Sequence, residues 1–423
     1  MSHSGAELLR KRDFRWLLAG QFISLLGDGM YYSVLLFLVL ALGTSGASLK
    51  AGVVGFLESL PFLVFAPVAG AIADRFDRKR VMLSADSLRG GLLLVFVGWV
   101  QVKGLSAAGI AVLAFLLASF STPFNPARDA MLPSLFPDPQ ECARANAVIQ
   151  SVTQAAWFGG TFLSALILGA LRNLLPGHSE VARMILLLAV DGVTFYVSYY
   201  CIARVRIERA GASAPPGSIT QEMRSGARFV LGFGALLMVL GLTAVDNFFI
   251  MGPATVGGNL LIKNTLGRGV SDYALFLSAL FAGWLAGAVL VGAMAGRLRP
   301  IPTLLSGIFM DGFTYIPFFW IRSFPLALAA IFVHGFFIPF IIVSRTTWIQ
   351  RVVPDAHRGK AFAFVNMTVT GFMALSALAT GYLGQYVAPP TLFLGAGIGG
   401  AASAIFGLVL LAMPHDAAPG AAD

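Results

Sequence analysis

Long apolar stretches separated by short polar connections follow one another along almost the whole chain. A helix rises about 1.5 Å per residue, so roughly 20 mainly apolar residues are needed to cross a hydrocarbon core about 30 Å thick. The sequence therefore predicts an all-α polytopic membrane protein with no room for a soluble domain. Twelve stretches are predicted to span the membrane: 15–42, 49–73, 80–101, 105–125, 145–171, 182–203, 229–256, 271–295, 301–321, 324–346, 360–387 and 389–413.

The connections between these stretches alternate in their content of basic residues. Most of the 29 Lys and Arg residues fall in one alternate set, which includes the clusters at 10–15, 75–80 and 204–228. Because cytoplasmic loops carry the excess of Lys and Arg, this set and both chain ends are predicted to be cytoplasmic. The first apolar stretch is too long for the core of a cleavable signal peptide and should remain as a span. The expected location is a plasma membrane of the bacterial inner-membrane type.

One connection, residues 205–225, is longer than the others and contains the polar, Pro- and Gly-rich run GASAPPGS. It predicts a flexible cytoplasmic linker between an N-terminal six-helix bundle, 1–204, and a C-terminal six-helix bundle, 226–423.

An internal repeat supports this division. The segment PFNPARDAMLPSLFPD at 123–138 resembles PFIIVSRTTWIQRVVPD at 339–355, and Arg345 lies 217 residues after Arg128. GAIADRF at 70–76 similarly resembles GAMAGRL at 292–298. Parallel six-span repeats are one of the symmetric designs of secondary transporters, whose substrate path runs between the halves. The alternative is a duplicated membrane scaffold without a transport role.

Composition agrees with a membrane protein and narrows its chemistry. The chain is 57% apolar and 12% charged with a mean hydropathy of +0.81, whereas soluble domains are about 25% charged. Its net charge of +9 does not predict a nucleic-acid partner, because the basic residues form short clusters between spans. The sequence contains no Gly-rich phosphate-binding loop, His/Cys metal cluster or nucleophile elbow. We therefore expect no ATP-driven pumping, no enzyme activity, no cofactor and no bound metal. The two cysteines, Cys142 and Cys201, are predicted to lie reduced at the cytoplasmic side.

The stretch GAIADRFDRKR at 70–80 resembles the signature that major facilitator proteins carry between their second and third helices. The resemblance extends to Gly27-Asp28, to ADSLRGG around Arg89 and to VPDAHRGKAFA before the eleventh span. It is closest to the drug:proton antiporter branch with macrolide-efflux, enterobactin-exporter and lysophospholipid-transporter relatives. The resemblance implies a major facilitator fold of 12 transmembrane helices in two pseudo-symmetric six-helix bundles.

The same resemblance implies a cytoplasmic gate, in which the acidic and basic residues of the signature pair with neighbouring helices. Asp77 stands where many members have glycine, and Gly296 stands where an acidic residue would complete a second gate, so only the first half can build it. The alternative is that the basic residues of the signature only anchor the topology. The predicted gate residues are Gly70, Asp74, Arg75, Arg78 and Arg89.

Carboxyl groups inside spans invite a functional interpretation, because each costs about 2.5–3.5 kcal/mol at mid-bilayer on insertion scales. We assign Asp86 to an ion pair with Arg89, and assign Asp191 and Asp311, on helices that the family places outermost, to hydrogen bonds between helices. The remaining acids and one mid-span histidine are predicted to couple transport to protons, with Asp28 as the first choice. For each of them the alternative is a neutral, hydrogen-bonded side chain. The predicted proton-coupling residues are Asp28, Glu58, Asp246 and His334.

Amphipathic side chains on the helices that line the cavity in this family are the candidate substrate contacts. For the two arginines the competing interpretation is snorkelling to the interface, and for the aromatic residues it is packing or a place in the interfacial belt. The predicted cavity residues are Tyr31, Tyr32, Asn125, Arg128, Asn247, Arg345 and Trp348.

Taken together, the residues and the resemblance predict a monomeric secondary transporter that exports a small amphipathic solute of drug or siderophore type in exchange for protons. Its expected partners are the lipid bilayer, the solute and protons. Two alternatives remain open: a lysophospholipid flippase, and a membrane receptor or assembly partner that does not transport.

Overall fold

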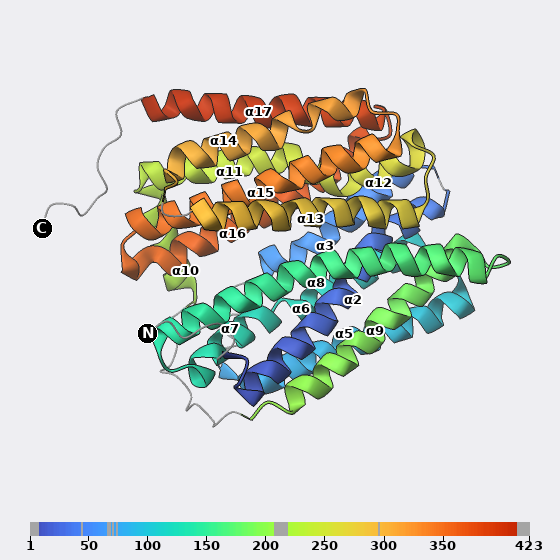
Figure 1. Cartoon of the computed structure of the whole chain (residues 1–423), viewed down its shortest axis with the longest axis horizontal. Helices are drawn as coiled ribbons and strands as arrows, with labels where there is room; N and C mark the ends of the chain where they lie inside the picture. The colour runs from blue at the N-terminus through green and yellow to red at the C-terminus, as the bar shows by residue number, and fades with distance from the viewer. Residues whose placement is uncertain are drawn as a thin grey trace, which may run out of the picture. The chain divides into compact units, whose positions relative to one another are not determined.

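The computed structural model of the chain describes residues 8–43, 45–65, 69, 72, 75–206, 219–294 and 297–412. Within these residues it is helical throughout, with no strand (Figure 1). Eleven helical segments are long and apolar enough to cross a membrane. The predicted all-α polytopic fold is thereby confirmed.

The ninth predicted span, 301–321, differs from the others. It consists of α14 (Pro300–Phe313) followed by the short 3-10 helix η3 (Ile316–Phe319). The N–H of Thr314 already bonds back to Met310 and Gly312, and Pro317 has no N–H with which to continue the ladder. The two pieces together cover the predicted segment, but neither reaches the length of a single spanning helix.

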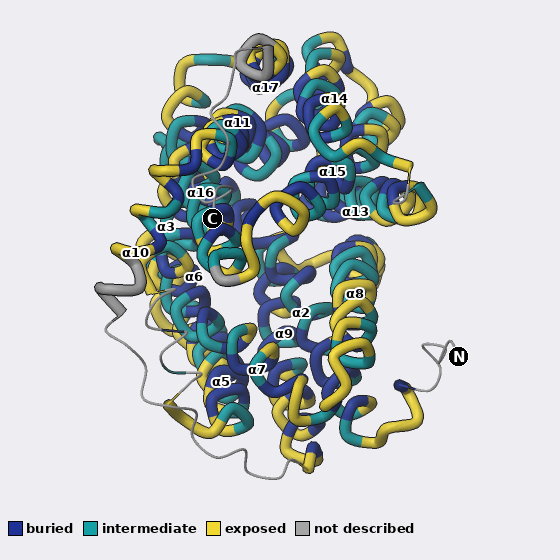
Figure 2. The backbone as a smooth tube through the Cα atoms, turned by 90° about the vertical axis from the view of Figure 1, so that its left-hand side faces the viewer, coloured by how far each residue is buried: buried dark blue, intermediate teal, exposed yellow. Residues whose placement is uncertain are grey.

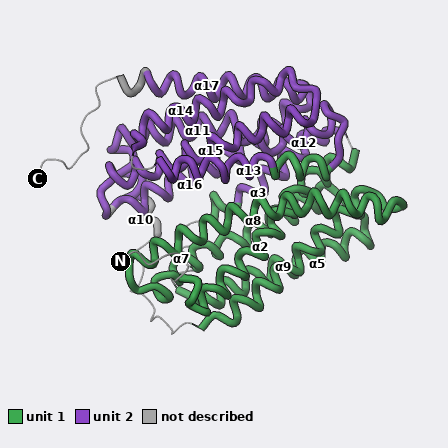
Figure 3. The backbone as a smooth tube through the Cα atoms, viewed as in Figure 1, with its two compact units in different colours: residues 1–44, 61–216, 270–278 green, residues 45–60, 217–269, 279–423 purple. Residues whose placement is uncertain are grey.

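Backbone packing divides the described chain into two compact units (Figure 3). Unit 1 comprises residues 1–44, 61–216 and 270–278, and unit 2 comprises 45–60, 217–269 and 279–423. Most of α3 (Ala47–Val64) therefore packs within unit 2, and the first residues of α13 (Val270–Met294) pack within unit 1. The predicted bundle boundary lies in 205–225, of which 207–218 fall outside the described residues.

In unit 1 the first helix of the repeat, α2 (Arg12–Ala41), packs against α8 (Pro139–Leu174) and α9 (Glu180–Ala203). The third, α5 (Arg78–Lys103), also packs against α9. Two further helices, α6 (Ala107–Ser121) and α7 (Phe124–Leu135), pack against α5. Glycine permits the closest approach, because a Cβ on Gly29 of α2 would lie 3.1 Å from Gly160 Cα in α8.

Unit 2 repeats this arrangement with its own helices. The first of them, α11 (Gly234–Gly252), packs against α16 (Asp355–Leu383) and α17 (Pro389–Ala412), while α14 packs against α17. The fourth, α15 (Phe324–Val352), packs against α14 and α16, and the amphipathic helix α10 (Ile219–Leu231) lies against α11 and α16. The sequence repeat, with an offset of 217 residues between the two halves, thus corresponds to the same pattern of helix packing in both units.

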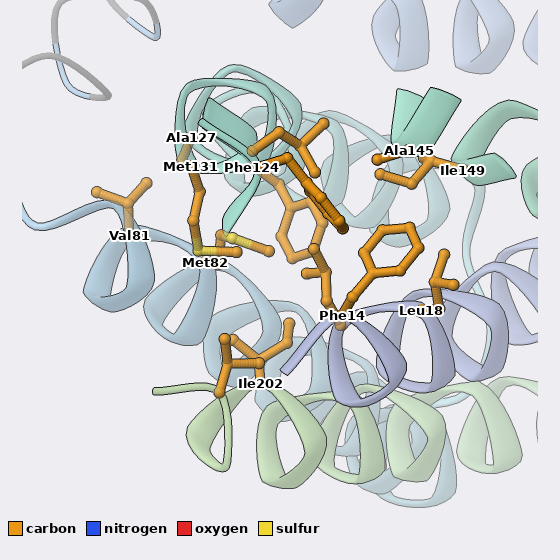
Figure 4. Packing of buried hydrophobic residues seen from close by; sticks show 14 of the residues in the cluster. Phe14, Leu18, Val81, Met82, Phe124, Ala127, Met131, Ala145, Ile149 and Ile202 are labelled. Atoms are coloured by element: carbon orange, nitrogen blue, oxygen red, sulfur yellow. The ribbon is translucent and has the colours of Figure 1, made fainter. Parts of the chain in front are cut away.

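Matching hydrophobic clusters join the ends of the helices in each unit. In unit 1, Phe14 packs against Phe136 at 5.0 Å and shares the cluster with Met82, Met131 and Ile202 (Figure 4). In unit 2 the corresponding cluster contains Phe233, Leu304, Trp348, Ile349 and Val365. In each unit the cluster joins the start of the first helix, the start of the third helix and the end of the fourth helix of that half. A parallel repeat predicts this matching packing.

Many large apolar side chains remain exposed on helix surfaces, and exposed positions run along α8 in Figure 2. Monomeric soluble proteins rarely expose apolar patches of this extent, whereas a bilayer solvates them. Among the most exposed are Val95, Val102, Leu174, Val289 and Trp320.

The seventh predicted span is not a regular α-helix throughout. At Pro253 the α11 ladder passes into the π-helical turn η1 (Pro253–Gly257), then α12 (Gly258–Leu260) and a second π-helical turn, η2 (Leu261–Thr265). The Ser376 hydroxyl of α16 accepts from Gly252 N–H at 2.7 Å and donates to Phe248 C=O. A side chain thereby bridges the two backbone groups that an α-helix would pair directly.

Candidate functional site

A buried ion pair lies between the middle of α2 and the first half of α5. Asp28 Oδ1 is 2.5 Å from Arg89 Nη2, and the two side chains are only 19% and 11% exposed. The guanidinium also stacks over the Phe195 ring of α9, 3.9 Å from its centroid. Because α9 packs against both α2 and α5, it holds the two charges together on one side of the pair.

Two more carboxylates surround this pair. Asp86 lies one turn before Arg89 in α5, and Asp191 lies in α9, where Thr194 donates to it at 3.1 Å. Both interact electrostatically with Arg89, and Asp28 repels both of them. We call these four side chains the unit 1 charge cluster.

The expected ion pair between Asp86 and Arg89 is not the one that forms. Arg89 reaches across to Asp28 on the neighbouring helix, while Asp86 lies close to Ser198 and interacts with Arg89 only electrostatically. The reason is the length of the arginine side chain, which carries the Arg89 guanidinium away from its own helix to Asp28 on α2.

Unit 2 contains a second cluster built around Asp246 of α11. Asp246 lies 218 residues after Asp28, which is within one residue of the repeat offset, and it is 3% exposed. Arg345 of α15 interacts electrostatically with it and donates to Thr243 Oγ1, one turn before Asp246, at 3.3 Å. The two halves thus place an acid at the same point of their first helix, each attracted to an arginine from a different helix.

His334 and Asp311 complete the unit 2 cluster. His334 Nδ1 of α15 lies 3.6 Å from Asp311 Oδ1 of α14 and 3.0 Å from Thr314 Oγ1. The imidazole stacks on the Tyr315 ring at 4.2 Å between centroids. Asp246 interacts electrostatically with Asp311, so the predicted proton-coupling residues Asp246 and His334 belong to one cluster.

Glu58, the remaining predicted proton-coupling residue, is half-buried in α3, in the part of that helix that packs within unit 2. Glu58 belongs neither to the Asp28–Arg89 pair nor to the Asp311–His334 pair.

The predicted cavity residues of unit 1 have different surroundings. Tyr31 is buried in α2, and the ring of its half-buried neighbour Tyr32 meets Trp157 of α8 edge-on at 5.6 Å. Asn125 is exposed in α7. Arg128 is buried and binds the next residue, Asp129, through two nitrogens at 2.7 and 2.8 Å.

In unit 2, two of the three predicted cavity residues are packed. Asn247 is buried and donates to the Thr243 carbonyl of its own helix at 2.8 Å. Trp348 is buried in the unit 2 hydrophobic cluster and stacks on Phe233 at 6.4 Å. Arg345 is half-buried beside Asp246, as described above.

Of the predicted gate residues, Gly70 and Asp74 lie outside the described residues, as does Gly296. Arg75 is exposed. Arg78 donates to the Ala130 carbonyl of α7 at 2.7 Å, and its neighbour Lys79 donates to the Ala203 and Val205 carbonyls at the end of α9. Lys79 therefore also caps α9, where a cation complements the negative end of the helix dipole.

Sequence reasoning set Asp191 and Asp311 aside, yet both lie in the charge clusters. The sequence contains a pattern that could have identified them, because each has an adjacent glycine, Gly192 or Gly312, just as Asp28 follows Gly27. A Cβ on Gly192 or Gly312 would press against the helix packed beside it. Glycine next to an acid thus lets two helices close over the carboxylate.

No group of three or more His, Cys, Asp or Glu side chains able to hold a metal ion occurs among the residues that the structure describes. Within the two clusters, the ion-pair and hydrogen-bond partners of Asp28, Asp191 and Asp311 are arginine, hydroxyl and histidine side chains, respectively.

Comparison with known proteins places this architecture in a family. The chain resembles macrolide efflux protein A of Streptococcus pyogenes, with 23% identity over 379 residues, covering 87% of this chain and 88% of that protein. It resembles the multidrug efflux pump Tap of Mycolicibacterium fortuitum with 26% identity, covering 86% of each. The crystal structure of the nucleoside transporter NupG superposes with a TM-score of 0.70 at 12% identity, covering 95% of this chain and all of that one, which is a likeness of fold.

The family model of the Major Facilitator Superfamily matches residues 17–190 and 248–422, which cover most of each half. The matched ranges include Asp28, Asp86, Arg89, Asp311 and His334, while Asp191 and Asp246 lie just outside them. The resemblance that the signature at 70–80 indicates is therefore confirmed, and the chain is a multi-pass membrane transporter that belongs to the Major Facilitator Superfamily.

Proposed function

We propose that the protein is a proton-coupled exporter of small amphipathic solutes, and that Asp28 is its principal proton-binding group. The observation that carries this proposal is the Asp28–Arg89 ion pair, buried inside a span and surrounded by two further carboxylates.

The pair has two charge states, one with Asp28 ionised and one with Asp28 protonated. While Asp28 is ionised, its charge and that of Arg89 compensate each other in a medium where an isolated charge is costly. A proton on Asp28 removes that compensation, and the guanidinium is then attracted by Asp86 and Asp191, which already interact with it. Because these acids lie on α5 and α9, protonation of Asp28 changes which helices are held together. Coupling of this kind is what alternating access needs.

The direction and the solute class are drawn from relatives. Two proteins that the chain resembles over most of its length are named for efflux of macrolides and of multiple drugs. We propose the same direction here, in a bacterial inner membrane with both termini cytoplasmic and the protein acting as a monomer. The two six-helix bundles would alternate around the solute, with Arg75 and Arg78 at the cytoplasmic gate and Tyr31, Tyr32 and Arg345 contacting the solute.

The test is flux in proteoliposomes under an imposed pH gradient. Two probes separate the candidate functions: radiolabelled erythromycin, a macrolide, and a labelled lysophosphatidylethanolamine. We expect the wild type to accumulate erythromycin in the direction opposite to proton flow. Asp28→Asn should abolish this accumulation while retaining exchange of labelled for unlabelled erythromycin, which needs no net proton movement.

The matched control is Asp138→Asn, which removes an exposed carboxylate that caps α8 and leaves an amide oxygen that can still cap it. Accumulation by Asp28→Asn equal to the wild type would contradict the role of Asp28. Movement of the lysolipid alone would favour a flippase, and no flux of either probe would count against the proposal.

A further inference from the structure

The proposed function uses one acid of unit 1 and leaves the paired groups of unit 2 without a role. Asp311 and His334 are 3% and 2% exposed, and they face each other from two different helices. We propose that Asp311 and His334 form a second proton-binding site, which holds one proton between a carboxylate and an imidazole inside unit 2. This inference rests on the proposed proton coupling and adds a second site to it.

The geometry around His334 favours a histidine that can accept a proton. Nδ1 points at both Asp311 Oδ1 and the Thr314 hydroxyl, so a protonated ring finds an acceptor on that side. The Tyr315 ring stacked on the imidazole presents a face that attracts a cation. Thr314 can donate to the Asp311 carbonyl and accept from His334, so its hydroxyl serves the charged ring without any rearrangement of the backbone.

The hydrogen-bonding capacity of the Asp311 carboxylate is not fully satisfied. Asp311 Oδ1 is buried and has no hydrogen-bond partner, and the same is true of Asp246 Oδ1 in the same cluster. A buried acceptor left unpaired is destabilising, and more so when it carries a charge. A proton is a ligand small enough to satisfy Asp311 in this packed interface, where α14 and α17 approach at Gly312 and Gly400.

The other charged groups that face the pair are few. From α11 comes Asp246, which repels Asp311, and from α15 comes Arg345, which is drawn to Asp246. Residues 279–294 of α13 and the whole of α17 contain no acidic, basic or histidine residue, and those of α16 all lie at its start, between Asp355 and Lys360. Arg345 can balance one of the two acids, and the proton on the Asp311–His334 pair balances the other.

The proton balance of the site is simple. Uptake of one proton converts a carboxylate and a neutral imidazole either into a carboxylate with an imidazolium or into a carboxylic acid with a neutral imidazole. Release returns the same proton to the solvent, and no covalent bond other than the N–H or O–H bond forms or breaks. The site therefore adds one positive charge to unit 2 when it is loaded.

Proton binding can be measured directly on purified protein by infrared difference spectroscopy, which reports protonated carboxyl groups during a pH titration. We expect Asp311→Asn to remove one of the titrating carboxyl signals of the wild type. His334→Gln should leave that signal present but move it along the pH axis, because its partner is gone. Ser306→Ala, at an exposed position of the same helix α14, is the matched control and should resemble the wild type.

An unchanged set of carboxyl signals in Asp311→Asn would overturn the proposal. So would a His334→Gln titration that coincides with that of the wild type. Should Asp311→Asn fail to fold, Asp311→Glu retains the carboxyl group and should show the signal at a shifted pH, while a position identical to the wild type would contradict the site.

A second readout counts protons during transport. At zero membrane potential, each coupled proton contributes about a tenfold accumulation ratio per pH unit, since about 1.4 kcal/mol corresponds to a factor of ten. We expect Asp311→Asn to accumulate erythromycin with a ratio about tenfold lower than the wild type at one pH unit. An equal ratio would show that the site takes no part in coupling.

The two proposals fail in different ways. If Asp28→Asn transports like the wild type, the proposed role of unit 1 fails, yet the infrared signal of Asp311 can still be present. If the Asp311 signal is absent while Asp28→Asn loses accumulation, only the second site fails.

Discussion

Gly27 of α2 lies directly against the carboxylate of Asp191 in α9, so closely that a methyl group on residue 27 would overlap the acid and the Thr194 hydroxyl. Since Asp28 follows Gly27, the contact that buries Asp191 also positions the first acid of the unit 1 charge cluster beside Arg89.

Gly27→Ala is therefore expected to destabilise the protein by about 1–3 kcal/mol, because overpacking forces α2 and α9 apart. The measurement is thermal unfolding of the purified protein in detergent. Gly98→Ala in α5 is the control, because a Cβ there meets no atom within 4 Å. Its unfolding temperature should equal or exceed that of the wild type, and a comparable loss in both variants would contradict the role of the Gly27 contact.

The Asp28–Arg89 pair makes a second prediction about stability. Asp28→Asn or Arg89→Gln alone breaks the direct ion pair, and loss of one partner of a buried pair costs up to about 3–5 kcal/mol. The cost should be smaller for Asp28→Asn, because Asp86 and Asp191 still attract Arg89. The double variant removes both charges and should be more stable than either single variant. A double-mutant cycle of unfolding free energies measures this coupling. Additive losses would mean that the two side chains do not depend on each other.

Ser376 provides a third prediction. Ser376→Ala leaves the Gly252 N–H and the Phe248 carbonyl without their bridging hydroxyl, at an expected cost of about 1–3 kcal/mol. Amide hydrogen exchange should rise at 248–257 and remain unchanged in α14, which lies outside this contact. Ser376→Thr retains the hydroxyl and serves as the control. Equal exchange in Ser376→Ala and the wild type would show that the α11 ladder does not need the bridge.

A fourth prediction concerns topology. In a variant with Cys142→Ser and Cys201→Ser, His178→Cys at an exposed position between α8 and α9 should react with an impermeant maleimide added to intact cells. Gln140→Cys, at an exposed position at the start of α8, should react only after permeabilisation. The positive-inside bias of Lys and Arg underlies this orientation. The opposite labelling pattern would reverse the predicted orientation and the position of the proposed gate.

The sequence by itself determined the fold class, because only helices satisfy every backbone group within one apolar segment of the membrane. Its periodic apolar stretches gave nearly every span, and the residues at 123–138 and 339–355 revealed the repeat that the packing of α2 and α11 then displays. It also identified Asp28, Asp246 and His334 as candidates, because an ionisable residue inside an apolar stretch is recognisable from the sequence alone.

Only the tertiary structure decided which charges meet. Arg89 lies three residues from Asp86 in sequence, yet its long side chain reaches Asp28 across the helix interface. Asp191 and Asp311 entered the clusters because glycines allow α9 and α14 to close on their neighbours, and such a contact depends on the rotation of two helices about their axes. Spacing along one helix fixes the face on which a residue lies, whereas its partner on another helix follows from packing alone.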